Sequence, residues 1–195
     1  MTRQLLTQFV FMGMSERNAP RRQDSMDDAH ILRRIKVEHD LFRCNVAELL
    51  GLAKTIMHLE EMSDVSAEFR SLVRVVGYLS MLHEHMEREE DVIFPYLRKR
   101  GFSTLCLTAE KEHVRLRESV GNLMGLVLSV TEISLEEFKN RLMEIVYLFY
   151  PLLLDHLAFE EELIHPIALV AIDNPDTWET IKALCDQMGY CELPA

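Results

Sequence analysis

The sequence is poor in the residues that interrupt regular structure. Its 195 residues include only 7 glycines and 6 prolines, which leaves few candidates for turns. Long elements joined by few connections are therefore expected, and that pattern favours helices. The apolar share of 48% excludes a disordered chain, and the length is enough for one domain with a proper core.

Positive charge is also scarce. The chain has 21 Lys and Arg residues against 32 Asp and Glu residues, a formal net charge of −11 at pH 7. A surface of this sign repels phosphate backbones, so nucleic acid is not an expected partner. The same charge suits a soluble protein that attracts cations.

The sequence lacks other features as well. We find no apolar run that would predict a membrane span, and residues 1–14 lack a signal-peptide core and cleavage site. The four cysteines, Cys44, Cys106, Cys185 and Cys191, form no CxxC pair and no dense framework. We therefore expect a cytoplasmic protein without a membrane partner.

Apolar residues recur at three- and four-residue steps through most of the chain, which predicts helices. After a tail over residues 1–24, we expect four long helices over about 26–60, 65–99, 103–130 and 134–171. The expected caps are Ser25, Ser103 or Thr104, and Ser134, and the expected kinks are Pro151 and Pro166. Short links force the helices to lie antiparallel. The prediction is an all-α, up-down-up-down four-helix bundle over residues 25–172. A short fifth helix over about 177–188, within the C-terminal part 173–195, is expected to end at Gly189.

The two halves of the predicted bundle repeat each other. Each half has a Glu-His pair, then a His-x-x-x-Glu motif, then a proline six residues after the motif's glutamate. These are Glu38-His39, His85, Glu89 and Pro95 in the first half, and Glu112-His113, His156, Glu160 and Pro166 in the second. Residues four apart share a helix face, so each motif directs a nitrogen and a carboxylate to one metal or two adjacent ones. This donor set suits iron, manganese or zinc better than calcium or magnesium.

The four histidines of the repeat also lie at similar depths in the predicted bundle. Each is 10 to 16 residues from the helix end at a shared pole, which is roughly 15 to 24 Å along the axis. A common level in four separate helices predicts one shared site.

This pattern resembles the hemerythrin-like, or HHE cation-binding, family, and the resemblance covers residues 26–171. It implies a hemerythrin-like bundle with two iron ions in a non-haem centre, bridged by oxo or hydroxo. The terminal ligands that it implies are His39, His85, His113 and His156. The bridging ligands that it implies are Glu89 and Glu160.

The sequence departs from the oxygen-carrying hemerythrins at two places. They have a second histidine one turn after the third-helix ligand, where Arg117 stands here, and a fourth-helix carboxylate five residues after its histidine, whereas Glu160 follows by four. The symmetric set of four histidines and two glutamates is closest to the iron–sulfur-repair (RIC) di-iron proteins.

The remaining polar residues have simpler interpretations. Glu90, Glu161 and Glu162 are expected to be surface charge, and Glu38 and Glu112 to be solvated. His83 and His165 are expected to point to a different side of their helices from the ligands, so we exclude them from the ligand set. His30 and His58 are excluded because they lie too far along the helix from His39. We expect Cys185 and Cys191 to be structural or free thiols, and a redox role is the alternative.

We expect a di-iron protein that binds dioxygen or nitric oxide, or that senses or stores iron, as a monomer or homodimer. No nucleophile triad or reductase module is evident, so no catalytic residue and no organic cofactor site is predicted. One alternative is an iron–sulfur cluster repair or nitric-oxide-reducing enzyme. The other is a metal-free helical interaction module. Manganese or zinc are the expected substitutes for iron.

Overall fold

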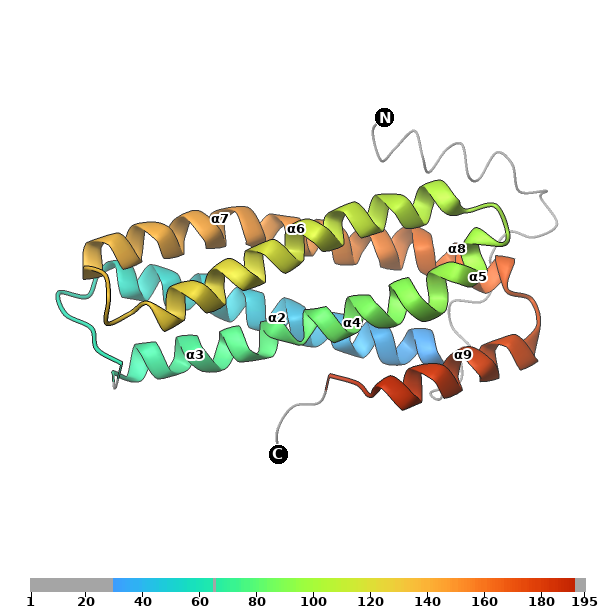
Figure 1. The fold of residues 1–195 in the computed structure, drawn as a ribbon, viewed down its shortest axis with the longest axis horizontal. Helices are drawn as coiled ribbons and strands as arrows, with labels where there is room; N and C mark the ends of the chain where they lie inside the picture. The colour runs from blue at the N-terminus through green and yellow to red at the C-terminus, as the bar shows by residue number, and fades with distance from the viewer. Residues whose placement is uncertain (1–29, 65, 192–195) are drawn as a thin grey trace.

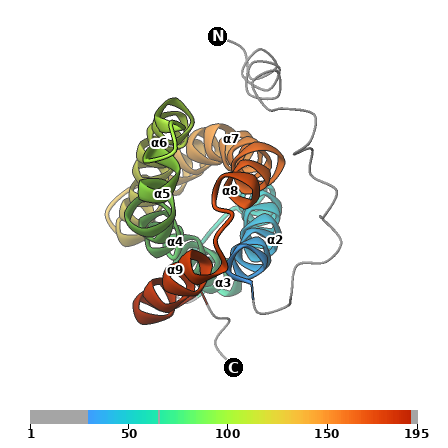
Figure 2. The same cartoon turned by 90° about the vertical axis from the view of Figure 1, so that its right-hand side faces the viewer.

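The computed structural model describes residues 30–64 and 66–191, and within these ranges it contains helices and turns but no strand. Four long helical segments run alternately up and down along one axis, which confirms the predicted bundle (Figure 1). Seen from one end, the segments surround a common centre, and the last helix lies outside this ring (Figure 2).

The first and third segments are single helices, α2 (Ile31–Met57) and α6 (Ser103–Leu128). The second segment consists of α3 (Ala67–Ser80), α4 (Leu82–Arg88), the π-helix η2 (Glu89–Ile93) and α5 (Phe94–Arg98). The fourth consists of α7 (Leu135–Phe159), the π-helix η3 (Glu160–Ile164) and α8 (His165–Ala171). The outer helix α9 (Pro175–Met188) packs against α2, α4 and η2.

Side-chain caps define several helix starts. The hydroxyls of Ser66 and Ser134 accept backbone hydrogen bonds at the starts of α3 and α7, as predicted for Ser134. Helix α2 begins at Ile31, later than predicted, because His30 has extended backbone and its Nδ1 accepts from Leu32 N–H. The predicted cap at Ser25 lies outside the described residues. The predicted side-chain cap of α6 is wrong, because Phe102 occupies that position.

The two π-helices correct the prediction of continuous α-helices. Each is closed by a backbone hydrogen bond that spans five residues, from Phe94 N–H to the Glu89 carbonyl and from His165 N–H to the Glu160 carbonyl. In each case the residue after the N–H donor is a proline, Pro95 after Phe94 and Pro166 after His165. Proline has no N–H, and its ring collides with the carbonyl four residues earlier in a regular helix, so a wider turn accommodates it. By contrast, α7 continues as an α-helix through Pro151.

One long helical stretch corrects the prediction about apolar runs. Over Leu135–Ala171 an 18-residue window has a mean hydropathy of 1.5 with at most two charged residues, which meets the length and composition of a membrane span. The core helix of a bundle meets the same criteria. In this fold the stretch packs against α2 and α6, and 39% of that window is buried.

The buried interior is divided into two apolar clusters. One extends towards the α2–α3 and α6–α7 connections and includes Phe42, Leu72 and Phe149. The other lies towards α5, α8 and α9 and includes Ile35, Phe94 and Ile167. Between them lies a layer of buried polar and charged side chains: Glu38, His39, His85, Arg88, Glu89, His113, His156 and Glu160. Burying polar groups without partners is costly, so this layer requires an explanation.

Candidate metal centre

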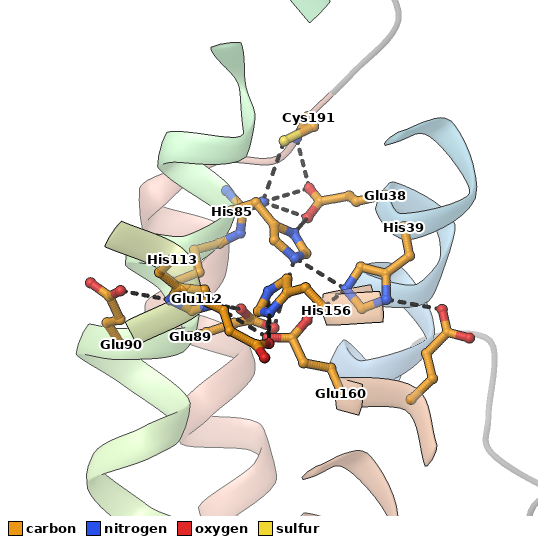
Figure 3. Close-up of polar contacts among 12 residues, drawn as sticks. Glu38, His39, His85, Glu89, Glu90, Glu112, His113, His156, Glu160 and Cys191 are labelled. Atoms are coloured by element: carbon orange, nitrogen blue, oxygen red, sulfur yellow. Dashed lines mark hydrogen bonds and ion pairs between the residues drawn. The ribbon is translucent and has the colours of Figure 1, made fainter. Parts of the chain in front are cut away.

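Each of the four long segments contributes one histidine to the polar layer. His39 comes from α2, His85 from α4, His113 from α6 and His156 from α7 (Figure 3). Glu89 and Glu160, the first residues of η2 and η3, complete the set. All six residues are at most 2% exposed. The sequence repeat therefore predicted which six side chains the fold brings together.

The Nε2 atoms of the histidines turn towards the two glutamates. His39 Nε2 lies 3.1 Å from His85 Nε2 and 3.3 Å from Glu160 Oε2. His85 Nε2 lies 3.7 Å from Glu89 Oε1. On the other side of the glutamates, His113 Nε2 lies 3.5 Å from Glu89 Oε2 and 3.3 Å from Glu160 Oε1. Each carboxylate thus faces a histidine of the pair His39 and His85 and a histidine of the pair His113 and His156.

These side chains form two overlapping groups that suggest a site for two metal ions. The first contains His39 and His85, the second His113 and His156, and both contain Glu89 and Glu160. Within each group the donor atoms all lie within 4.8 Å of one another.

Three buried atoms test whether a cation fits. Glu89 Oε2, Glu160 Oε2 and His156 Nε2 have no hydrogen-bond partner among the described residues. Buried polar atoms are nearly always paired, and buried carboxylates in particular need a positive partner. Imidazole nitrogens with carboxylate oxygens are a donor set for iron, manganese or zinc, so the residues fit a pair of such ions.

A glutamate holds the Nδ1 atom of each histidine. The Nδ1-to-oxygen distances are 2.9 Å for His39–Glu161, 2.7 Å for His85–Glu38, 2.6 Å for His113–Glu90 and 3.1 Å for His156–Glu112. An Nδ1–H that donates to a carboxylate fixes the ring and leaves Nε2 as the atom available to a metal.

This arrangement corrects the prediction that these four glutamates are surface or solvated charge. Their functional signal was in the sequence, because Glu38 and Glu112 are 74 residues apart and Glu90 and Glu161 are 71 residues apart, the same steps as the ligands. Glu162, in contrast, is exposed as expected.

Arginines pair with three of the four glutamates that hold the histidine Nδ1 atoms. Arg117, which stands where the oxygen carriers have a further histidine, donates to both oxygens of Glu90 at 2.9 Å each. Arg43 pairs with Glu161 at 2.8 Å. Arg88, fully buried, pairs with Glu38 at 2.5 Å.

The carboxylates make the centre favour positive charge. Burial would lower the pKa of His39, but the nearby carboxylates of Glu160 and Glu161 outweigh it and raise the pKa to about 9. For His113, burial is likewise outweighed by Glu160, Glu89 and Glu90, and the pKa rises to about 11. Burial would raise the pKa of Glu161, yet His39 and Arg43 lower it to about 2. In the metal-free protein, protons on imidazole therefore supply the positive charge.

The remaining histidines lie outside the two groups. His30 caps α2, as does His58 at its other end, and His83 is exposed and pairs with Glu87. His165 was expected to face away, but its ring stacks on His39 with centroids 5.5 Å apart. The π-turn between His156 and His165 explains the error, because the prediction assumed 100° per residue throughout.

A cavity of about 170 Å³ opens beside the centre, between α3, α4 and α6. Met86, which lies between His85 and Glu89 in the chain, and Arg117 both line it. Apolar side chains, Leu82 and Val120 among them, form much of the remaining wall.

The family model for the hemerythrin HHE cation binding domain matches residues 30–168, which span the four helical segments and all six residues of the two groups. No curated protein matches the chain.

Proposed function

Because the chain belongs to the hemerythrin HHE cation-binding domain family, we propose that it holds two iron ions and binds a small diatomic molecule, dioxygen or nitric oxide, at them. The observation that carries this proposal is the pair of buried groups that share Glu89 and Glu160. A shared pair of carboxylates suits two adjacent cations better than one.

In this proposal each histidine is a terminal ligand through Nε2. His39 and His85 would hold one iron and His113 and His156 the other, with Glu89 and Glu160 shared between the two. The support is that the Nδ1 atoms are already taken by glutamates and that the carboxylate oxygens face both pairs. Manganese or zinc would fit the same donors.

The donor count favours binding of an external ligand. Two nitrogens and two bridging oxygens give each ion four protein donors, whereas iron in such surroundings accepts more, so positions remain open. The cavity with a largely apolar wall comes close to the centre at Met86, the residue after His85, and none of the six donors lines it. When bound, iron would supply the redox and ligand-binding chemistry that the protein side chains lack.

We propose a binding, sensing or iron-storage role in the cytoplasm, as a monomer or homodimer. All four cysteines are free thiols, which supports a reducing compartment. The second candidate is a di-iron enzyme that repairs iron–sulfur clusters or reduces nitric oxide, as in the RIC type. The specific observation in its favour is the symmetric set of four histidines and two glutamates without a further histidine at Arg117.

Nitric oxide distinguishes the two roles. Reduced, iron-loaded protein is exposed to excess nitric oxide without oxygen, while an electrode follows the uptake and gas chromatography follows nitrous oxide. A binding protein takes up no more nitric oxide than it has iron and releases no nitrous oxide. Continuing release of nitrous oxide with an added electron donor would instead establish the enzyme.

The metal-free interaction module remains the third candidate. It predicts that added iron changes the stability of neither the wild-type protein nor His85→Ala and His156→Ala. Our proposal predicts that iron stabilises the wild-type protein and not these variants, which thermal unfolding measures directly.

A further inference from the structure

The residues after α9 fold back onto the bundle, and we call Gly189–Cys191 the C-terminal strap. Gly189 has φ +87° and ψ −179°, a backbone conformation that is essentially restricted to glycine. The conformation therefore depends on the absence of a side chain at this residue. Tyr190 then lies beneath two guanidinium groups, with Arg34 at 4.3 Å and Arg88 at 5.3 Å from its ring centroid.

Hydrogen bonds to three other parts of the chain hold the strap against the bundle, and Arg88 Nη2 also donates to Cys191 Sγ at 3.6 Å. The backbone N–H of Cys191 donates to Glu38 Oε1 at 2.7 Å, and its thiol donates to the Met81 carbonyl at 3.4 Å. The Gly189 carbonyl accepts from Arg88 Nη1 at 2.9 Å. Cys191 is only 5% exposed, so its thiol meets solvent reagents only when the strap opens.

The strap reaches a histidine of the centre through one carboxylate. Glu38 accepts from Cys191 N–H and from Arg88 Nη2, and its Oε2 also accepts from His85 Nδ1 at 2.7 Å (Figure 3). Glu38 and Arg88 are 1% and 0% exposed. Because all these groups are buried, loss of the strap would remove one hydrogen-bond donor from the charged Glu38 carboxylate. The same carboxylate orients His85.

The contact of the strap with Glu38 and Arg88 occurs in only one half of the repeat. The repeat step of 71 residues places Phe159 at the position equivalent to Arg88, and phenylalanine offers no guanidinium. The strap also packs where α9 lies against α4 and α2, the helices that carry His85 and His39. The strap therefore contacts the half of the centre that contains His39 and His85.

We propose that the C-terminal strap is a positioning element for His85, so that strap docking and metal binding at His39, His85, Glu89 and Glu160 stabilise each other. The inference rests on the proposed metal-binding function. It makes the strap responsive to the metal centre. Since coupling between two binding events is reciprocal, the factor by which metal favours the docked strap equals the factor by which the docked strap favours metal.

Thiol labelling measures the strap directly. Full-length protein is treated with N-ethylmaleimide without oxygen, with and without Fe²⁺, and peptide mass spectrometry follows each cysteine. Cys191 is expected to react at least about tenfold more slowly with Fe²⁺. The exposed Cys44 measures the reactivity of the reagent, and Cys106, which is buried on α6, measures global unfolding.

Two glycine variants measure the reciprocal effect. Gly189→Ala forces a side chain into the positive-φ position and is expected to weaken Fe²⁺ binding by the factor seen at Cys191. Gly51→Ala, where an added Cβ meets open space on the exposed side of α2, is the matched control and should leave affinity unchanged. Cys191→Ala keeps the N–H that bonds Glu38, so its effect should be smaller than that of Gly189→Ala.

The outcomes separate the strap from the proposed function. If the wild-type protein binds Fe²⁺ and Gly189→Ala binds it equally well, the strap inference is wrong and the function stands. Equal slowing at Cys106 and Cys191 would also overturn it, because the protection would then be global. If the wild-type protein binds no Fe²⁺, both the function and the strap inference fail.

Discussion

At the scale of single residues, the glutamates that hold Nδ1 are the part of the centre for which the sequence-based prediction was wrong. Taken one at a time, Glu90 or Glu161 is an ordinary charged residue beside a buried one, and solvation is the simplest interpretation. The paired recurrence of these residues with their neighbouring ligands was the available signal. Their partners lie on other helices, so only the folded bundle reveals which histidine each one holds.

Glu161 and Glu162 provide a matched test of this outer layer. Glu161→Gln removes the charge that holds His39 Nδ1, and losses of this kind typically cost about 10- to 100-fold in metal affinity. Glu162→Gln changes an exposed neighbour and should leave affinity unchanged. Titration with Fe²⁺ under anaerobic conditions measures both. Equal affinities in the two variants would contradict a role for Glu161 in orienting His39.

Metal binding is expected to release protons. In the metal-free protein at pH 7, His39 and His113 are protonated, because their pKa values are raised to about 9 and about 11. A metal must displace these protons, so affinity should rise as the pH increases through about 9. Calorimetric titration with Zn²⁺ in buffers of different ionisation enthalpy counts the protons released, and fewer are expected at pH 9 than at pH 7.

The same shifts affect the stability of the metal-free protein. A raised histidine pKa contributes stability that is fully present below the unfolded value of 6.5 and is lost as the pH rises through the folded value. The metal-free protein should therefore become less stable as the pH rises through about 9. Metal affinity and metal-free stability that are both independent of pH between 7 and 9 would contradict this account.

At the scale of elements, the long α-helices followed from periodicity, but the π-turns did not. The prolines indicated kinks, and the sequence pattern does not distinguish a kinked α-helix from a π-turn. Pro151 and Pro166 show the limit, because one lies within continuous α7 and the other follows η3. A proline alone therefore does not determine where a π-turn forms.

These two prolines give a prediction about the π-turns. Pro166→Ala restores an N–H and allows η3 to revert towards α-helix, which would rotate one side of the turn by about 100° and move Glu160 relative to its partners. Metal affinity is expected to fall. Pro151→Ala removes a proline from a continuous helix and should raise stability, by up to about 3 kcal/mol, with metal affinity unchanged. Isothermal titration and thermal unfolding of both variants check this, and full affinity in Pro166→Ala would contradict it.

At the scale of the whole molecule, the polar layer separates two apolar clusters inside one bundle. The antiparallel fold and the six inward-facing side chains were predictable, because an internal repeat on strongly periodic helices determines both. The strap was not, because the contact of Cys191 with Glu38 joins residues 153 apart and depends on how α9 packs. Metal bound in the layer should stabilise the entire fold, since all four helical segments supply donors.

The metal content of the purified protein tests the central claim most directly. Protein produced with ample iron is analysed for metal per chain, together with His83→Gln and His85→Gln, two histidines on α4 of which only His85 belongs to the centre. Two irons per chain are expected in the wild-type protein and in His83→Gln, with a clear loss in His85→Gln. Fewer than one metal per chain in the wild-type protein, or equal metal content in all three, would contradict the account.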